Sequence, residues 1–303
     1  MARVSERPRL APIDLATLSY VAATTLALFV FGRGDRVTST WLLCAHVMVV
    51  AVALLAPRAR AAGLVGQFVG EWYPIILVTA LYSEVGMLNL EYGYHHDFAI
   101  QRLEQWVFGS QVSYRWIREM PNPLLSSLLH SCYLSYFAIL VVAPLGQWLS
   151  GRRDGARRTI FAIMVTLYFC YAVQLFFPVT GPRYAFALAD NPATRVWPAR
   201  AAQWVLDQGD AWGAAFPSSH VAASMLATFC ALRFWRPLGL ALTPPTIGLI
   251  FSVVYGQFHY GVDALSGIIV GIAVWVSLNN SPWRQRAAVL QPAADLRSSP
   301  LRL

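Results

Sequence analysis

The sequence predicts an all-α protein, a polytopic helical bundle that crosses a membrane about eight times. Of its 303 residues, 57% are hydrophobic and only 13% are charged, whereas a soluble domain carries about 25% charged residues. Apolar runs of about 20 residues recur along the chain, and this is the length that a helix needs to cross a bilayer. The composition therefore excludes a soluble domain and favours an integral membrane protein.

Eight apolar segments account for most of the chain, and we expect each of them to form a membrane-spanning helix. Their ranges are 14–32, 38–57, 68–89, 122–148, 158–178, 217–234, 242–258 and 262–279. The first two spans, in residues 1–60, precede a membrane domain over residues 61–280. The remaining segment, 281–303, contains Arg, Pro and Ser residues and is expected to be a disordered cytoplasmic tail.

The distribution of positive charge predicts how these spans are oriented. All 23 basic residues are arginine, and 15 of them lie in or beside the termini and the loops on the same side of the membrane. Short arginine-rich loops stay in the cytoplasm, so both termini are predicted to be cytoplasmic, in a bacterial inner or plasma membrane. The net charge of +8 follows from this topology and does not indicate binding of nucleic acid.

Ionisable residues are few in the first three spans. His46 lies within the second span, where we expect a hydrogen-bonded structural role. Glu71 and Glu84 lie near the ends of the third span. A carboxylate at membrane depth is costly and often functional, whereas one at the end of a span can be solvated at the interface. Both interpretations stay open for these two residues.

The segment 90–121 follows the third span and mixes apolar with charged residues. Its central part, HHDFAIQRLEQWVFG, is typical of an amphipathic helix that lies in the headgroup layer. His95 and His96 precede Asp97, but no further ligand follows at a fixed spacing, so no metal site is predicted. The four cysteines also lack metal-ligand spacing. His130 is expected to be structural, although a contribution of these histidines to a site stays open.

The most specific polar pattern, His259–Tyr260–Gly261–Val262–Asp263, lies between the seventh and eighth spans. His259 and Asp263 are four residues apart, so both side chains face the same way if the segment is helical. A carboxylate beside an imidazole fixes its tautomer and raises its basicity, which a nucleophilic or general-base histidine needs. Asp263 also begins an apolar span, where a carboxylate needs a partner. A functional role is therefore favoured for this pair.

The sixth span begins with the sequence Pro217–Ser218–Ser219–His220. A proline and a serine suit the first positions of a helix, and the Ser218 hydroxyl is able to cap it. Free backbone N–H groups at a helix start attract anions. His220 in the first turn is able to donate a proton to a leaving oxygen. Taken alone, a capped helix with an interfacial histidine explains this motif more simply.

Arg183 lies in a Gly-Pro-Arg-Tyr turn just outside the fifth span and is followed by Tyr184. A guanidinium group binds phosphate oxygens bidentately and stays charged. Taken singly, an ordinary interfacial arginine without a function is the favoured explanation. However, this turn, the beginning of the sixth span and His259 are all predicted on the non-cytoplasmic side. Their shared location predicts one site for a phosphate ester.

An arginine, a serine-rich turn with a histidine and then His-x-x-x-Asp, in this order, resemble the type 2 phosphatidic acid phosphatase superfamily. The resemblance covers about residues 68–279 and implies a helical bundle with a six-span catalytic core. Three positions depart from the family's motifs: Phe176 stands at a lysine, Ser219 at a glycine and Val253 at an arginine. The matching residues are Arg183, Pro217, Ser218, His220, Ser252, His259 and Asp263.

The Gly-Pro-Arg-Tyr turn and the His259–Tyr260 pair look more like the branch of inositol phosphorylceramide and sphingomyelin synthases, which move a phospho-headgroup between lipids. The resemblance implies a phosphohistidine mechanism without metal or cofactor. In it, His259 attacks phosphorus, Asp263 holds the His259 ring and His220 protonates the leaving alkoxide. The groups that it implies for binding the substrate are Arg183, Ser218, Ser219, Tyr184 and Tyr260.

Three functions stay open at this point. The first is a lipid phosphotransferase that uses a hydroxyl acceptor, and the second is a plain lipid phosphate or polyprenyl pyrophosphate phosphatase that uses water. The third is a non-catalytic lipid-binding or transport protein, because two phosphate-binding cations of the family's motifs are missing at Phe176 and Val253. The first two share a lipid phosphate as substrate, and the sequence identifies neither that lipid nor the oligomeric state.

Overall fold

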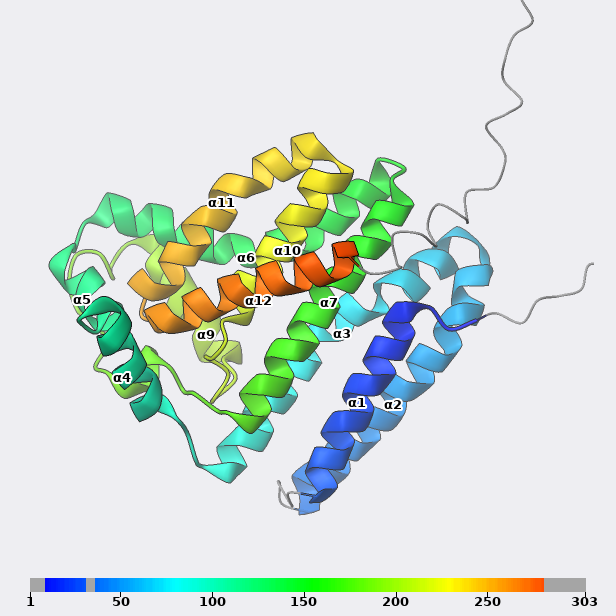
Figure 1. Ribbon diagram of the computed structural model, residues 1–303, viewed down its shortest axis with the longest axis horizontal. Helices are drawn as coiled ribbons and strands as arrows, with labels where there is room; N and C mark the ends of the chain where they lie inside the picture. The colour runs from blue at the N-terminus through cyan, green and yellow to red at the C-terminus, as the bar shows by residue number, and fades with distance from the viewer. Residues whose placement is uncertain (1–8, 31–35, 281–303) are drawn as a thin grey trace, which may run out of the picture.

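The computed structural model describes residues 9–30 and 36–280, and this part of the chain is helical with no named strand (Figure 1). The predicted all-α class is thus confirmed. The predicted tail, 281–303, lies outside the described residues. The helices are α1 (Pro12–Val30), α2 (Arg36–Ala61), α3 (Gly63–Tyr92), α4 (Asp97–Phe108), α5 (Val112–Glu119), α6 (Pro123–Leu149), α7 (Arg153–Phe176), α8 (Pro182–Ala185), α9 (Trp197–Gly209), α10 (Ser219–Phe234), α11 (Arg236–Tyr255) and α12 (Gly261–Asn280).

Seven of these helices are long and apolar enough to cross a membrane: α1, α2, α3, α6, α7, α11 and α12. The remaining predicted span is the sixth, 217–234. It corresponds to α10, which has only 16 residues. At 1.5 Å per residue it is roughly 24 Å long, less than the ~30 Å of a bilayer's hydrocarbon core. α10 packs against α6, α7, α11 and α12 and buries most of its residues. It is therefore the central core helix.

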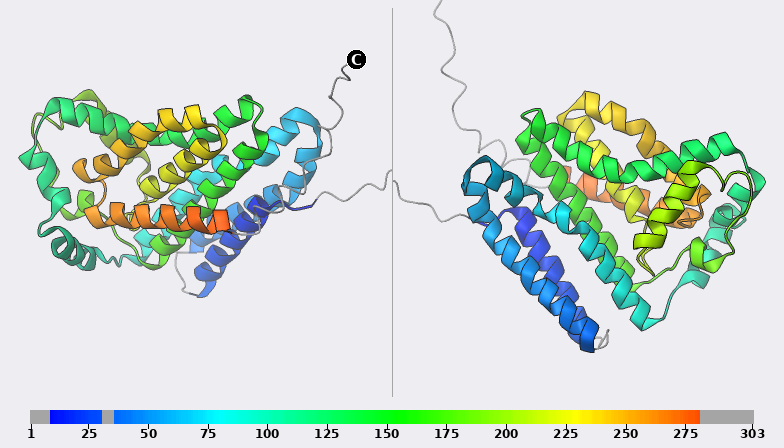
Figure 2. Two further views of the ribbon diagram at one scale, coloured as in Figure 1. Left: turned by 45° about the horizontal axis from the view of Figure 1, so that its top comes forward. Right: turned by 180° about the vertical axis from the view of Figure 1, so that it is seen from behind.

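The helices α1 and α2 form an antiparallel pair at one side of the molecule, away from α4 and α5 (Figures 1 and 2). A buried carboxylate joins this pair to α3: Asp14 accepts a hydrogen bond from the Tyr73 hydroxyl at 3.0 Å and forms an ion pair with Arg60. Tyr20 of α1 stacks on Tyr168 of α7, with ring centroids 4.7 Å apart. The pair is thus packed on the rest of the bundle.

The two carboxylates of α3 are buried, each at 4% exposure, and both are paired. Glu84 lies 2.9 Å from His46 Nε2, and Glu71 lies 2.7 Å from the Arg157 guanidinium. Of the two interpretations that the sequence leaves open, burial inside the bundle with a partner fits both carboxylates, and solvation at the interface does not. The physical reason is that α3 begins at Gly63, several residues before the predicted span, which moves Glu71 two turns into the helix. His46 has the structural role that the sequence predicts.

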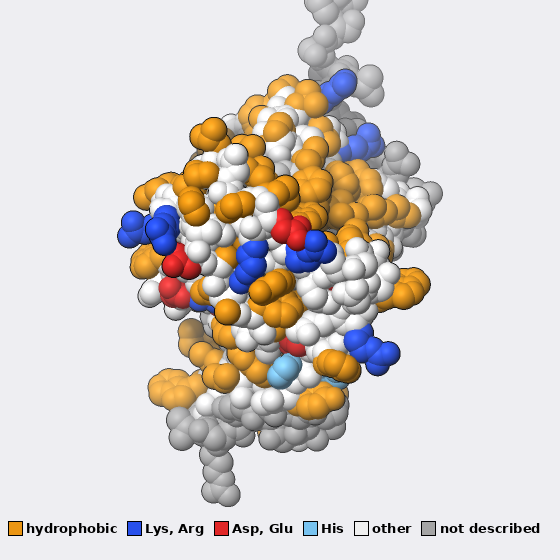
Figure 3. Space-filling model, turned by 90° about the vertical axis from the view of Figure 1, so that its left-hand side faces the viewer, with side chains coloured by type: hydrophobic (Ala, Val, Ile, Leu, Met, Phe, Trp, Pro, Cys, Tyr) orange, Lys and Arg blue, Asp and Glu red, His pale blue; other side chains and the backbone are white. Residues whose placement is uncertain are grey.

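The segment between α3 and α6 forms two short helices, α4 and α5, at one end of the bundle (Figure 1). We call this the α4–α5 end. α4 is amphipathic, but its aromatic side chains face outward and its carboxylates face inward. Phe98 and Trp106 are 73% and 82% exposed, while Asp97 and Glu104 are buried. The face of the molecule at this end carries arginine, acidic and histidine side chains among apolar ones (Figure 3). Aromatic side chains beside charged ones suit a surface at headgroup level.

Chain direction brings the predicted motifs to the α4–α5 end. α7 ends there at Phe176, before the turn with Arg183, and α11 ends there at Tyr255, before His259. α10 starts there, with Ser218 as its N-cap: the Ser218 hydroxyl accepts a hydrogen bond from Val221 N at 3.4 Å. The cap is as the sequence predicts. Segments far apart in the chain therefore meet in one region.

Candidate active site

A small cavity at the α4–α5 end is lined by Arg183, His220 and His259, one residue from each predicted motif. Its volume of about 10 Å³ is close to the space that a single water molecule requires. The cavity's other lining residues are Tyr82, Tyr133, Thr180, Leu206, Asp210, Ala211, Ala214, Ala215 and Phe258. The sequence therefore identified the three side chains that share this space, although they are separated by up to 76 positions.

His259 lies in the tight turn that joins α11 to α12. Its backbone N–H donates to Val253 O at 2.8 Å, and its Nδ1–H donates to the carbonyl oxygen of Ala215, also at 2.8 Å. We assign the proton to Nδ1 because the partner is a carbonyl, which only accepts. The opposite nitrogen, Nε2, is then unprotonated and lies 3.4 Å from His220 Nδ1. An imidazole with one nitrogen fixed and the other free is the form that a nucleophile needs.

Burial controls the charge of His259, which is 4% exposed. Desolvation lowers the pKa of His259 to about 4, against the hydrogen bond to Ala215 O and the charge of Asp210, which both raise it. The ring is therefore neutral at physiological pH. A neutral ring keeps the Nε2 lone pair available.

Asp263 lies beneath His259 but does not hydrogen-bond to its ring. The distance from His259 Nδ1 to Asp263 Oδ2 is 3.7 Å, beyond hydrogen-bond length, and Oδ2 accepts instead from Tyr260 N at 2.8 Å. The expected stacking assumed one helix for both residues. α12 begins only at Gly261, so His259 precedes the helix that contains Asp263. The ring is held by the Ala215 carbonyl, which no sequence pattern indicates.

His220 is the second residue of α10 and packs between two aromatic rings. Its ring centroid lies 4.4 Å from that of Tyr136 and 5.6 Å from that of Tyr133. Ser218 and Ser219 are buried and do not line the cavity. Ser218 N donates to Asp263 O at 3.1 Å, which joins the start of α10 to the start of α12. The two serines therefore contribute to the start of α10, and in this way they help to position the His220 side chain.

Arg183 lies on the single turn α8, which begins after Gly181. Gly181 has a φ of +93°, and a Cβ atom there would lie 3.2 Å from Phe258 O, so glycine is required for this approach. One Arg183 nitrogen, Nη2, forms an ion pair with Asp207, and Nε lies 4.0 Å from Asp210 Oδ2. Nη1 is buried and has no hydrogen-bond partner among the described residues. This guanidinium group therefore has an N–H available for a phosphate oxygen.

Two site residues, Asp207 and Asp210, have no sequence motif; Asp207 lies in the last turn of α9 and Asp210 is its C-cap. Asp210 lines the cavity and accepts a hydrogen bond from the Tyr82 hydroxyl at 3.3 Å. Burial raises the pKa of the Asp210 carboxyl, against the opposing effect of Arg183. The one available signal was the presence of acidic residues in a loop otherwise rich in arginine and tryptophan. A phosphate that enters the cavity must compete with these carboxylates for Arg183.

The two tyrosines expected to bind substrate do not line the cavity. Tyr184 is 48% exposed, and its ring centroid lies 6.0 Å from the Arg183 guanidinium carbon. Tyr260 is fully buried, and its hydroxyl donates to Asp97 Oδ1 at 2.9 Å. Two departures from the family's motifs are also away from the cavity: Phe176 is 52% exposed, while Val253 is fully buried. Arg183 is thus the only arginine among the described residues that line this cavity.

The remaining histidines have structural contacts. His96 stacks on Phe177 with ring centroids 4.0 Å apart, and His95 Nδ1 lies 2.8 Å from Asp97 Oδ2. His130 hydrogen-bonds to Ser126 within α6 and does not line the cavity. Within residues 9–30 and 36–280 there is no group of three or more His, Cys, Asp or Glu side chains that could hold a metal ion.

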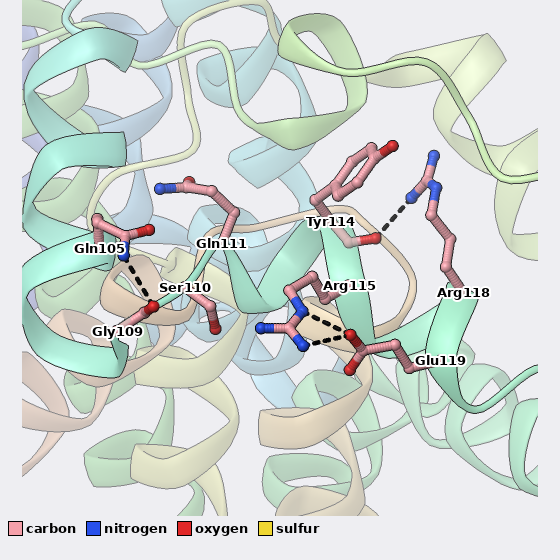
Figure 4. Close-up of a pocket in the computed structure, with 8 residues that line it drawn as sticks. All are labelled: Gln105, Gly109, Ser110, Gln111, Tyr114, Arg115, Arg118 and Glu119. Atoms are coloured by element: carbon pink, nitrogen blue, oxygen red, sulfur yellow. Dashed lines mark hydrogen bonds and ion pairs between the residues drawn. The ribbon is translucent and has the colours of Figure 1, made fainter.

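A larger and more open pocket between α4 and α5 is not the site, because its charged groups already have partners within the protein (Figure 4). Arg115 forms an ion pair with Glu119, and Arg118 donates to the backbone oxygen of Tyr114. None of the predicted motif residues lines it. The small cavity with the two histidines is the candidate active site.

Comparison with known proteins agrees with the geometry. The sequence matches the family model described as PAP2 superfamily over residues 98–277, which includes α10, α11 and all the cavity's histidines but not α1–α3. No curated protein and no solved structure matches the chain. The match covers more than half of the sequence, so the chain belongs to the PAP2 superfamily and is a membrane-embedded enzyme of the phosphatase type.

Proposed function

We propose that the protein is a lipid phosphotransferase that moves a phosphate-containing headgroup through a phosphohistidine on His259. The observation that supports this most is the state of the His259 ring. Its Nδ1–H is committed to the Ala215 carbonyl at 2.8 Å, while Nε2 is unprotonated in a cavity that also contains Arg183 and His220. An unprotonated nucleophilic nitrogen, with only the 3.4 Å contact to His220 Nδ1, lies in the same cavity as a guanidinium group. This arrangement matches the needs of phosphoryl transfer, which depends on positioning and on stabilisation of charge.

The reaction then has two balanced steps. In the first, His259 Nε2 attacks phosphorus, a P–N bond forms, and the P–O bond to the leaving alkoxide breaks. Burial lowers the pKa of His220 to about 3, so it takes up its second proton only when the negative charge of the bound phosphate offsets that burial. His220 then gives this proton to the alkoxide. In the second step, an acceptor oxygen attacks phosphorus, the P–N bond breaks, and His220 takes the acceptor's proton. Arg183 stabilises the equatorial oxygens in both steps through the Nη1–H that has no partner among the described residues.

The acceptor distinguishes the proposed transferase from its alternative, a plain lipid phosphate or polyprenyl pyrophosphate phosphatase. Transfer between lipids is also what inositol phosphorylceramide synthases perform, and this chain resembles them at the Gly-Pro-Arg-Tyr turn and at His259–Tyr260. Burial of the reacting groups supports exclusion of bulk water, because His259 is 4% exposed and the Arg183 side chain is 14% exposed. A closed site favours transfer to a bound hydroxyl over hydrolysis.

The test is a partition experiment with the purified protein in lipid nanodiscs. Phosphorus-labelled phospholipid is incubated alone and with a long-chain alcohol or a ceramide-like acceptor, and the labelled products are separated by chromatography. We expect labelled acceptor lipid to exceed free phosphate. Release of free phosphate alone would leave a phosphatase as the function. Turnover that persists in His259→Ala would reject the nucleophile, and absence of any turnover with every lipid would favour the non-catalytic alternative.

We further propose that the cavity opens on the non-cytoplasmic side, with both termini in the cytoplasm. The support is the arginine distribution: 15 of the 23 arginines belong to the side opposite the α4–α5 end or to the termini. Although α10 is shorter than the seven long helices, it leads the chain from the α4–α5 end to the start of α11, so the chain passes eight times between the two sides. Alkaline phosphatase and green fluorescent protein fused at the C-terminus test this orientation. Fluorescence without phosphatase activity is expected, and the reverse result would invert the topology.

A further inference from the structure

A carboxylate that the mechanism above does not use links two of the motif loops. Asp97 is the first residue of α4 and is only 3% exposed. Its Oδ2 accepts a hydrogen bond from Thr180 N at 2.8 Å, and its Oδ1 accepts from Gly181 N at 2.9 Å. These amides immediately precede the helical turn that contains Arg183. Asp97 therefore fixes the backbone from which the guanidinium group extends.

The same carboxylate also contacts the loop with the nucleophile. Oδ1 of Asp97 accepts a hydrogen bond from the Tyr260 hydroxyl at 2.9 Å, and Tyr260 directly follows His259. Gln101, one turn further along α4, donates to the same hydroxyl at 2.9 Å. One buried group thus joins the Arg183 loop and the His259 loop, although they are far apart in the sequence.

Bonds to a buried carboxylate are charge-assisted and stronger than neutral ones. The partners of Asp97 include two backbone amides, which would be left buried without an acceptor if the carboxylate were removed. Asp97 is also the first residue of its helix, where an acidic side chain ordinarily stabilises the helix itself. Here no side-chain cap is formed at this helix start, and the carboxylate is directed to other segments.

A second buried carboxylate on α4 provides a comparison. Glu104 accepts hydrogen bonds from Gly261 N at 2.6 Å and from Ser113 N at 3.1 Å. It therefore holds the start of α12 and the start of α5. No hydrogen bond joins it to Thr180 or Gly181, the two amides that Asp97 binds. Glu104 supports one motif loop, whereas Asp97 supports two.

We propose that Asp97 is a positioning residue that sets the separation between Arg183 and His259, and that Tyr260 transmits its effect to the nucleophile. The catalytic consequence rests on the proposed function. A phosphorus atom must contact both the guanidinium group and Nε2 of His259, and a misplacement of about 1 Å costs on the order of 10²-fold in rate. The link between the two loops is itself independent of any reaction.

Hydrogen–deuterium exchange tests this link without turnover. The full-length protein in nanodiscs is compared as wild type, Asp97→Asn, Glu104→Gln and Asp190→Asn, with peptides that cover residues 178–186 and 256–264. Asp190 is the matched control, because it is an 81% exposed carboxylate that pairs only with Arg195. We expect Asp97→Asn to accelerate exchange in both peptides, Glu104→Gln only in 256–264, and Asp190→Asn in neither.

The effect of Asp97→Asn on residues 256–264 is decisive, because Asp97 touches that loop only through the Tyr260 hydroxyl. Faster exchange confined to 178–186 would overturn the link. Tyr260→Phe provides a second variant if Asp97→Asn does not fold. It removes the hydroxyl while leaving the bonds from Asp97 to the 180–181 amides, and we expect faster exchange in 256–264 only. Unchanged exchange in that peptide would also overturn the proposal.

Inhibition by orthovanadate, a mimic of the transferred phosphoryl group, tests the catalytic consequence. We expect Asp97→Asn to raise the inhibition constant ~10-fold and to lower kcat/KM by ~10²-fold, with Tyr260→Phe intermediate and Asp190→Asn unchanged. A merely structural role would reduce the amount of folded enzyme and leave the inhibition constant of the remainder unchanged, which would overturn the positioning role. If the protein does not catalyse phosphotransfer, the wild type shows neither turnover nor inhibition by vanadate. The hydrogen–deuterium exchange result still tests whether Asp97 links the Arg183 and His259 loops.

Discussion

Two histidine–carboxylate pairs are buried within residues 9–30 and 36–280, and they differ in what their rings can do. In the bundle's N-terminal half, His46 Nε2 lies 2.9 Å from Glu84, and its Nδ1 lies 2.6 Å from the Thr25 hydroxyl. Both ring nitrogens are committed. In the His259–Asp263 pair, Nδ1–H donates to a backbone carbonyl and the carboxylate is 3.7 Å away. Nε2 faces a cavity, where its partner is His220 Nδ1 at the longer distance of 3.4 Å.

The difference shows that proximity of a carboxylate does not by itself make a histidine functional. A structural histidine satisfies both of its nitrogens inside the protein, because an unpaired buried nitrogen is costly. A nucleophilic histidine keeps one nitrogen available, and a space must exist beside it for the reacting group. His46 and Glu84 also lie outside residues 98–277, the part of the chain that matches the PAP2 superfamily.

The largest expected effect on kcat/KM comes from replacing the histidine of each pair by alanine, one variant at a time. His259→Ala is expected to lower kcat/KM on the order of 10⁴-fold or more, because it removes the nucleophile. His46→Ala is expected to retain the turnover of each folded molecule within about twofold, since no step of the reaction uses it. The measurement is single-turnover cleavage of a labelled lipid phosphate by equal amounts of folded protein. Comparable losses in both variants would remove the distinction between the pairs.

A second effect concerns the group that faces Nε2. His220→Asn is expected to lower the rate ~10²- to 10⁴-fold with an alkyl leaving group, because the alkoxide then leaves without a proton. With a p-nitrophenyl leaving group, which needs no proton, we expect a much smaller loss. The ratio of the two losses, measured on the same preparation, reports general-acid catalysis. An equal loss with both substrates would assign His220 a role in binding.

A third effect is the pH dependence of the two pairs. The lowered pKa of about 4 means that His259 is neutral above about pH 4 and is protonated, and thus inactive, below it. The acid limb of kcat/KM should lie near pH 4 and not near 6.5, with a tenfold fall per pH unit below it. Because the charge of Asp210 raises this pKa, Asp210→Asn should move the limb to lower pH. A limb near 6.5 would contradict a buried, uncharged nucleophile.

The smallest expected effect on turnover is that of His46→Ala, which should instead lower the stability of the fold. His46→Ala leaves Glu84 buried without its 2.9 Å partner, and we expect a loss of about 1–3 kcal/mol in the free energy of unfolding. Thermal unfolding in detergent, followed by the fluorescence of the tryptophans, measures it. Glu84→Gln, which can retain a hydrogen bond to the ring, should lose less. An unchanged unfolding temperature in His46→Ala would show that the pair contributes nothing to stability.

The sequence was sufficient for the helical class and for the three motif residues that meet in the cavity. Apolar length identifies spans, and Arg183, His220 and His259 stand out because polar side chains are rare beside them. The burial of α10 was not predictable from length alone, since its apolar residues face other helices and its 16 residues are fewer than the about 20 of an ordinary span. Composition does not distinguish burial in protein from burial in lipid.

The parts that the sequence did not predict depend on the backbone or on contacts between distant segments. The acceptor that fixes the His259 tautomer is the carbonyl of Ala215, and a carbonyl has no sequence signature. The carboxylates that engage Arg183 come from the end of α9, in a loop whose course only the fold determines. The sequence shows Asp97 only as the residue after two histidines, whereas in the fold it contacts residues 180, 181 and 260 as well as His95.

The central claim is that a free nitrogen of His259 becomes covalently bound to phosphorus. Rapid quenching of the enzyme with phosphorus-labelled lipid phosphate, followed by peptide mass spectrometry under alkaline conditions, tests this most directly. We expect an acid-labile, base-stable phosphate on His259, absent from His259→Ala and present in His46→Ala. Label on another residue, or continued turnover in His259→Ala, would contradict the account.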